Sequence, residues 1–176
     1  MTQEEKLMRK ISQGDREAAE QLVQLLYPEL LRYCLWHVPR REEAEDAVQE
    51  TFLKAIRYYD RYVHRGSCRA FLYCIAANTC IDMQRRSAAT AASIEALDEL
   101  PEECSPLERA EADWSFRQRI RALKPEQQEL VLLRFGQQLS LREIAAATGL
   151  PLRTVQSRLR AALKQLKNQL EQEVSP

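Results

Sequence analysis

Apolar side chains recur at helical spacing in two long stretches of the first half of the chain. In residues 41–58 the repeat falls on Ala44, Val48, Phe52, Ala55 and Ile56. In residues 67–86 it falls on Phe71, Leu72, Ile75, Ala76 and Thr79. Steps of three and four residues place such sets on one face of a helix. The opposite faces are mostly polar, with Glu42, Glu45, Asp46, Gln49 and Glu50 on the first and Cys74, Asn78, Asp82 and Arg85 on the second. Each stretch therefore predicts an amphipathic helix.

Helix breakers and caps place the remaining elements. Pro28 and Pro39 predict that the early residues form several short helices, because proline interrupts a helix. Near the C-terminus, Pro125 begins a predicted helix that runs to Gly136, a residue suited to a helix end. Residues 140–143 (SLRE) form a capping box, which opens a short helix over residues 141–148.

A glycine turn and one more helix complete this pattern. Residues 149–151 turn the chain, and residues 153–170 form the last predicted helix. Its inward stripe is expected to comprise Val155, Leu159, Ala162, Leu166 and Leu170.

Residues 87–108 interrupt the helical pattern. They are rich in small residues, then acidic, contain two prolines, and show no sustained apolar period, which is typical of a linker. Residues 105–108 (SPLE) offer an N-cap, a proline at the first helical position and a glutamate for a capping box. The sequence therefore predicts an all-α protein with two small helical domains, at residues 1–88 and 106–176, joined by a flexible acidic linker at residues 89–105.

Composition favours helices and excludes several function classes. Only four glycines occur among 176 residues, and no apolar run approaches the roughly 20 residues of a membrane span. The N-terminus lacks an apolar signal core, so a cytoplasmic protein is expected. No glycine-rich phosphate loop and no metal-ligand cluster are present, so we expect no enzymatic activity, no cofactor and no metal.

Five cysteines occur, without a CxxC pair, and small packed thiols are favoured over disulfides or zinc ligands. They are Cys34, Cys68, Cys74, Cys80 and Cys104.

The net charge of the chain is zero, but the charges are unevenly distributed and the C-terminal part is basic. Residues 1–86 carry 14 bases and 13 acids, and residues 87–108 carry six acids and no base. Residues 109–176 carry 12 bases against seven acids, a net charge of +5. Five bases fall in an acid-free stretch of the last predicted helix: Arg153, Arg158, Arg160, Lys164 and Lys167. A basic helix of this kind favours a nucleic-acid partner.

Residues 140–164 (SLREIAAATGLPLRTVQSRLRAALK) match a helix-turn-helix. Gly149 stands where the tight turn needs a positive φ. The outward face of the second helix carries Arg153, Ser157, Arg160, Lys164 and Lys167. Such a face fits the major groove, where arginine binds guanine edges or phosphates. A solvated basic face on an ordinary amphipathic helix is the alternative interpretation.

Three segments resemble one family of transcription proteins. Residues 45–52 (EDAVQETF) resemble the "EDAxQExF" signature of the extracytoplasmic-function (group 4, sigma-70 family) RNA polymerase sigma factors. Residues 71–78 (FLYCIAAN), followed by Asp82 and Arg85-Arg86, resemble their "WLYRIARNxxxDxxRR" segment. Residues 140–164 resemble their C-terminal helix-turn-helix. The resemblance implies a region 2-like domain, which docks on core RNA polymerase and the −10 promoter element, and a region 4-like domain, which binds the −35 element.

The resemblance also implies three sets of site residues. Polymerase-binding positions are Asp46, Gln49, Glu50 and Leu53. Positions at the −10 element are Tyr58, Tyr59, His64, Asn78, Arg85 and Arg86, with Tyr62 in the same polar segment. Positions at the −35 element are Arg142, Arg153, Thr154, Ser157, Arg158, Arg160 and Lys164. An anti-sigma factor is a further partner that the family implies.

The chain departs from the family pattern near the −10 positions. Phe71 replaces a frequent tryptophan, and Cys74 and Ala77 occupy positions that are usually basic. Two other functions therefore stay open at this point. One is a stand-alone helix-turn-helix regulator that binds DNA without polymerase. The other is a sigma-like interaction protein that does not open promoters.

Overall fold

The computed structural model describes the backbone of residues 1–62, 67–91 and 116–174, and every structural statement below concerns these residues. The chain divides into two compact units, Met1–Pro101 and Glu102–Pro176. Within the described ranges both units consist of helices and connecting turns, without a strand. This confirms the predicted all-α fold of two small domains. No helix in these ranges is long and apolar enough to span a bilayer.

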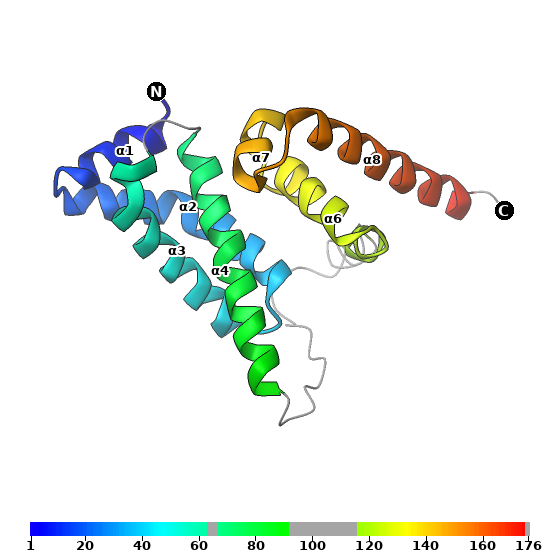
Figure 1. Cartoon of the computed structure of the whole chain (residues 1–176), viewed down its shortest axis with the longest axis horizontal. Helices are drawn as coiled ribbons and strands as arrows, with labels where there is room; N and C mark the ends of the chain where they lie inside the picture. The colour runs from blue at the N-terminus through cyan, green and yellow to red at the C-terminus, as the bar shows by residue number, and fades with distance from the viewer. Residues whose placement is uncertain (63–66, 92–115, 175–176) are drawn as a thin grey trace. The chain divides into compact units, whose positions relative to one another are not determined.

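The described residues of the first unit form four helices (Figure 1): α1 (Gln3–Ser12), α2 (Arg16–His37), α3 (Arg41–Tyr62) and α4 (Cys68–Ala91). Local signals set the first boundaries. The side chain of Thr2 accepts from the backbone N–H of Glu5, and the Glu5 carboxylate accepts from the backbone N–H of Thr2. Gly14, at φ +91°, turns the chain into α2, where Asp15 caps the new helix by accepting from the N–H of Ala18. These contacts satisfy N–H groups that have no partner inside a helix.

The prediction that Pro28 ends a short helix is wrong, because α2 continues through it to His37. Proline removes one backbone hydrogen bond, but Pro28 lies on the exposed side of the helix. Buried Leu26 and Leu30 flank it and anchor α2 in the core on both sides. Pro39, in contrast, follows the end of α2, as predicted.

The core of the first unit lies where α2, α3 and α4 pack together, and α1 contacts all three. Edge-to-face contact of Tyr33 and Tyr73, with ring centroids 5.3 Å apart, joins α2 to α4. The α3 face predicted to be apolar is buried at Ala44, Val48, Phe52 and Ala55. Ile56 is the exception: it is 40% exposed. It lies about 80° around the helix from Val48, at the border between the core and solvent.

Helix α4 reaches Ala91, five residues past the predicted end at Arg86. The first residues of the expected linker are therefore helical, and the domain boundary at residue 88 falls inside this helix. Residues 92–115, which include the predicted SPLE cap and Cys104, lie outside the described residues.

The second unit contains a helical segment over residues 116–121, then α6 (Pro125–Val131), the turn η1 (Leu132–Gly136), α7 (Leu141–Thr148) and α8 (Leu152–Val174) (Figure 1). Pro125 begins α6 as predicted. After α6 the chain continues to Gly136 in a wider π-helical turn, η1. There the N–H of Gln137 donates to the carbonyl of Leu132 over 3.0 Å. The core of the second unit consists of the inner face of α8 together with Ile120, Leu130, Leu133 and Ile144.

The inner stripe of α8 is shorter than predicted. Val155, Leu159 and Ala162 are buried, but Leu166 is half-buried and Leu170 is exposed. The residues C-terminal to Ala162 are only partly covered: Gln165 Nε2 still donates to the carbonyl of Ala122 over 3.4 Å, whereas Leu170 is 45% exposed.

Candidate nucleic-acid and protein interfaces

One face of α3 is exposed along about two helical turns and carries the residues predicted to bind polymerase. Asp46 and Gln49 are exposed, and Leu53 is 66% exposed. Their spacing of three and four residues places them in one row. An exposed leucine beside hydrogen-bonding groups is suited to a protein partner, because its burial contributes apolar contact while the polar groups fix orientation. We call Asp46, Gln49, Glu50 and Leu53 the α3 face.

Glu50 lies at the edge of the α3 face and already has a partner. Its Oε1 is 2.6 Å from Nζ of Lys54, one helical turn further on, and each side chain is about one third exposed. Lys54 Nζ also lies 3.4 Å from Oγ1 of Thr79 on α4, which is fully buried. Lys54 was not among the site residues predicted from the sequence. The i, i+4 spacing of Glu50 and Lys54 was the available signal, because such pairs meet on a helix surface.

The residues predicted to meet the −10 element lie on two elements. Tyr58, near the end of α3, is exposed, and the guanidinium of Arg61 lies 6.0 Å from its ring centroid. Tyr59 is half-buried, and burial raises the pKa of its hydroxyl. His64 and the side chain of Tyr62 lie outside the described residues.

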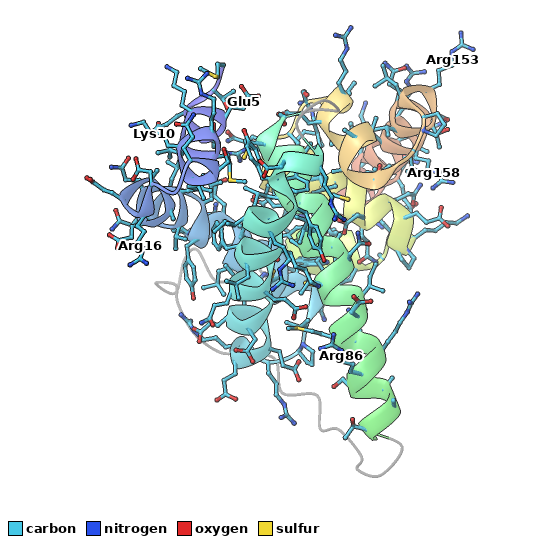
Figure 2. The ribbon with its side chains drawn as sticks, turned by 60° about the vertical axis from the view of Figure 1, so that its left-hand side comes forward. Glu5, Lys10, Arg16, Arg86, Arg153 and Arg158 are labelled. Atoms are coloured by element: carbon cyan, nitrogen blue, oxygen red, sulfur yellow. The ribbon has the colours of Figure 1, made fainter. Side chains whose placement is uncertain are left out.

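On α4, Asn78, Ile81 and Arg85 form an exposed row with steps of three and four residues. The amide Nδ2 of Asn78 lies 3.8 Å from Sγ of Cys74, one turn earlier on the same face. Arg86 is also exposed and projects from the C-terminal half of α4 (Figure 2). The helix therefore presents two guanidiniums and an amide on a continuous surface, a set that can bind phosphates and base edges.

The turn between α7 and α8 has the local geometry that the sequence predicts. Ser140 Oγ accepts from the N–H of Glu143 over 3.2 Å, and the Glu143 carboxylate accepts from the N–H of Ser140 over 2.8 Å. Gly149 ends α7 in the left-handed region, at φ +71°. These features fix the approach of α8, so that Ile144 on α7 and Val155 on α8 are both fully buried.

The outward face of α8 is basic. Arg153, Ser157, Arg160 and Lys164 are exposed at steps of four, three and four residues, about 180° from buried Val155. Figure 2 shows Arg153 projecting from the start of the helix. Thr154 is half-buried beside this row, and Arg142 is exposed on α7. An α-helix with such a row has a shape and charge suited to binding in the major groove of DNA.

Arg158 differs from the other predicted −35 residues. It lies about 100° around the helix from Ser157, and its Nη1 is 3.3 Å from Oε2 of Glu126 on α6. The side chain of Arg158 is 39% exposed, so it runs along α6 rather than straight into solvent.

The thiols have the character of packed side chains. Cys34, Cys68 and Cys80 are buried, and Cys74 is half-buried. Burial, together with nearby Glu4 and Glu5, raises the pKa of the Cys68 thiol to about 12. A hydrogen bond with Cys80, together with burial, raises the pKa of Cys34. Thiolates are the reactive form, so the raised pKa values of Cys34 and Cys68 keep these two buried thiols protonated at neutral pH. Within the described ranges, no three histidine, cysteine or acidic residues form a group able to hold a metal.

Comparison with known proteins places both units in one family. The profile of Sigma-70 region 2 matches residues 22–90, and that of Sigma-70 region 4 matches residues 114–166. The RNA polymerase sigma factor YlaC of Bacillus subtilis is 31% identical over 163 residues, which are 88% of this chain and 93% of YlaC. The ECF RNA polymerase sigma factor SigD of Mycobacterium tuberculosis is 34% identical over 169 residues, 89% of this chain and 79% of SigD.

Among solved structures, the sigma factor RpoE of Bartonella quintana, crystallised with the anti-sigma factor NepR, is similar. The TM-score is 0.66 at 25% identity, over 89% of this chain and 98% of RpoE.

Proposed function

Since the chain belongs to the sigma-70 family of RNA polymerase sigma factors, in its extracytoplasmic-function group, we propose that its two helical units divide polymerase docking and promoter recognition between them. It is an alternative sigma factor, which directs RNA polymerase in transcription initiation. A stand-alone helix-turn-helix regulator would leave the region 2 match over residues 22–90 without a function.

The α3 face docks on core RNA polymerase. Asp46 and Glu50 offer carboxylates and Gln49 offers an amide, groups that pair with arginine donors of a partner helix. Leu53 supplies apolar contact at the C-terminal end of this face. The observation that carries the proposal is the 66% exposure of Leu53 in a row with exposed Asp46 and Gln49, since none of the described residues of this unit buries the row.

The −10 element meets the end of α3 and the outer side of α4. Tyr58 and Tyr59 supply aromatic surfaces on which unstacked bases can pack, and His64 belongs to the same segment of sequence. Asn78, Arg85 and Arg86 contact bases and phosphates along α4. These roles support a unit over residues 1–88 that both docks on polymerase and binds melted DNA.

The −35 element meets the outward face of α8. Arg153, Ser157, Arg160 and Lys164 approach the major groove, with Thr154 beside them and Arg142 on a flanking phosphate. Arg158 reaches the DNA from the α6 side of this face. The corresponding domain covers residues 106–176, and the acidic residues 89–105 connect the two units. Tethering raises the effective concentration of the second unit once the first is bound.

Regulation by an anti-sigma factor is part of the proposal. RpoE, which resembles this chain over 98% of its own length, was solved in complex with the anti-sigma factor NepR. Sigma factors are in general regulators and not enzymes, and we propose that this chain likewise acts by binding alone, in the cytoplasm with the polymerase.

Binding to core polymerase tests the docking assignment. Asp46→Asn, Gln49→Ala and Leu53→Ala should each weaken binding of the full chain to sigma-free bacterial core polymerase by about 3- to 30-fold, an interface loss of about 0.7–2 kcal/mol. Gln3→Ala, which changes an exposed polar residue of α1, serves as the control and should bind normally. If the three α3 variants bind as tightly as the control, the docking assignment is wrong.

A further inference from the structure

Lys54 lies at the border between the α3 face and α4, and it contacts both. Its Nζ is 2.6 Å from Oε1 of Glu50 and 3.4 Å from Oγ1 of Thr79. Thr79 belongs to α4 and follows Asn78 directly, so a single ammonium group joins the proposed docking helix to the helix that carries the proposed −10 residues. The ammonium has three donors, enough for both contacts.

The surroundings make this pair more restrained than a usual surface ion pair. Both charged side chains are about one third exposed, and the hydroxyl of Thr79 is fully buried. The Arg41–Glu45 pair on the same helix has the same i, i+4 spacing and a distance of 3.0 Å, but its side chains are 48% and 37% exposed. The Arg41–Glu45 pair therefore serves as a more exposed reference for the Glu50–Lys54 pair, with the order of base and acid reversed.

Resting on the docking assignment made above, we infer that Lys54 is a positioning residue, which holds the carboxylate of Glu50 in the orientation that polymerase binds. A free glutamate loses rotamer freedom when a partner immobilises it, at a cost of about 0.5–1.5 kcal/mol. Lys54 fixes the carboxylate before docking, so part of that cost is already met in the unbound protein. A carboxylate has about four lone-pair sites, so Glu50 can accept from Lys54 and from a polymerase donor together.

An opposite electrostatic effect accompanies this positioning. The positive charge of Lys54 reduces the attraction of the α3 face for a basic partner, so removing it strengthens long-range attraction. Salt separates the two effects. At about 0.5 M salt the Debye length is about 4 Å, so exposed long-range attraction is largely screened and the loss of orientation remains.

The test is a double-mutant cycle on binding of the full chain to sigma-free core polymerase at about 0.5 M salt. Lys54→Met should weaken binding by about two- to fivefold, the range of a partly exposed ion pair. Lys54→Arg, which preserves the charge and the donors, should restore most of the affinity. In a Glu50→Gln background, Lys54→Met should have no further effect, because the carboxylate that it positions is absent. Thr79→Val should act in the same direction as Lys54→Met, more weakly.

Arg41→Met is the matched control, since it removes the basic member of an i, i+4 pair outside the α3 face and should leave affinity unchanged. Equal weakening by Lys54→Met with and without Glu50 would overturn the inference and indicate a general effect on the fold. Unchanged or tighter binding of Lys54→Met at about 0.5 M salt would overturn it as well. The Asp46→Asn and Gln49→Ala variants report separately on the docking face, so loss of the face and loss of the positioning role are distinguishable.

Discussion

Nη1 of Arg158 lies 3.3 Å from Oε2 of Glu126, and this ion pair joins the proposed recognition helix α8 to α6. Both side chains are more than one third exposed, so the pair should contribute less than about 1 kcal/mol to the unfolding free energy of its unit. Glu126→Gln should therefore lower that free energy only slightly in a urea titration. Glu171→Gln, which breaks the exposed Lys167–Glu171 contact of 3.7 Å on α8, is the control. A loss of about 3 kcal/mol or more for Glu126→Gln would show that the pair is buried in solution.

The capping box at the start of α7 should matter more than that ion pair. Ser140 and Glu143 each accept from the other's backbone N–H, and no intrahelical carbonyl can replace these bonds. Ser140→Ala should destabilise the second unit by about 1 kcal/mol, measured by urea unfolding. Ser157→Ala, on the exposed face of α8, should cost nothing. Equal stability of the two variants would contradict the importance of the cap.

Gly149 allows a direct test of the turn. It has φ +71°, and apart from its own chain neighbours no heavy atom lies within 4 Å of the position where a Cβ would stand, so Gly149→Ala adds backbone strain and no clash. We expect a loss of about 1–2 kcal/mol from the left-handed conformation alone. Gly136 has equally open space and no positive φ, so Gly136→Ala should be neutral or slightly stabilising. If both substitutions cost the same in thermal unfolding, the turn has another conformation in solution.

The thiols should react in the order of their exposure. In a Cys104→Ser background, Cys74 is half-buried and the others are buried, so Cys74 should be alkylated first at neutral pH, with Cys34, Cys68 and Cys80 protected. Mass spectrometry of timed iodoacetamide reactions measures this order. Rapid modification of Cys68 before Cys74 would contradict it.

The same thiols predict a loss of stability in alkali. The pKa of the Cys68 thiol is raised from 9.0 to about 12 in the folded protein. As the pH rises, this thiol therefore loses its proton in the unfolded chain before it does so in the folded protein. The stability contributed by the neutral thiol is complete below pH 9 and is lost as the pH rises toward 12. Urea unfolding at increasing pH should show a steeper decline for the natural chain than for Cys68→Ala. Parallel declines would place the thiol in contact with water.

Features set by neighbouring residues could be predicted from the sequence. The Ser140–Glu143 box, the start of α6 at Pro125 and the positive φ of Gly149 each depend on only a few consecutive residues. The apolar repeat predicted most of the buried faces of α3 and α4, because burial imposes a period of 3.6 residues; exposed Ile56 and half-buried Ile75 are the exceptions. Family motifs added the site residues, whose roles the structure by itself leaves as proposals.

Features set by packing between helices could not be predicted. Helix α2 passes Pro28 because Leu26 and Leu30 are held in the core on both sides of it. The contact of Lys54 with Thr79 joins residues that are 25 apart in the sequence, and no local sequence pattern indicates it. Similarly, Leu170 fits the apolar period of α8 but lies beyond the helices that could bury it.

As an alternative sigma factor, this chain should direct core RNA polymerase to specific promoters. The most direct measurement is transcription in vitro, with the purified chain, sigma-free bacterial core polymerase and a library of random or genomic promoters. We predict defined transcripts that require the chain and disappear with Gln49→Ala on α3 or Arg153→Ala on α8. Specific duplex binding without any binding to core polymerase would contradict the claim and leave a stand-alone DNA-binding protein. Core binding without a transcript would contradict promoter opening and leave a sigma-like interaction protein.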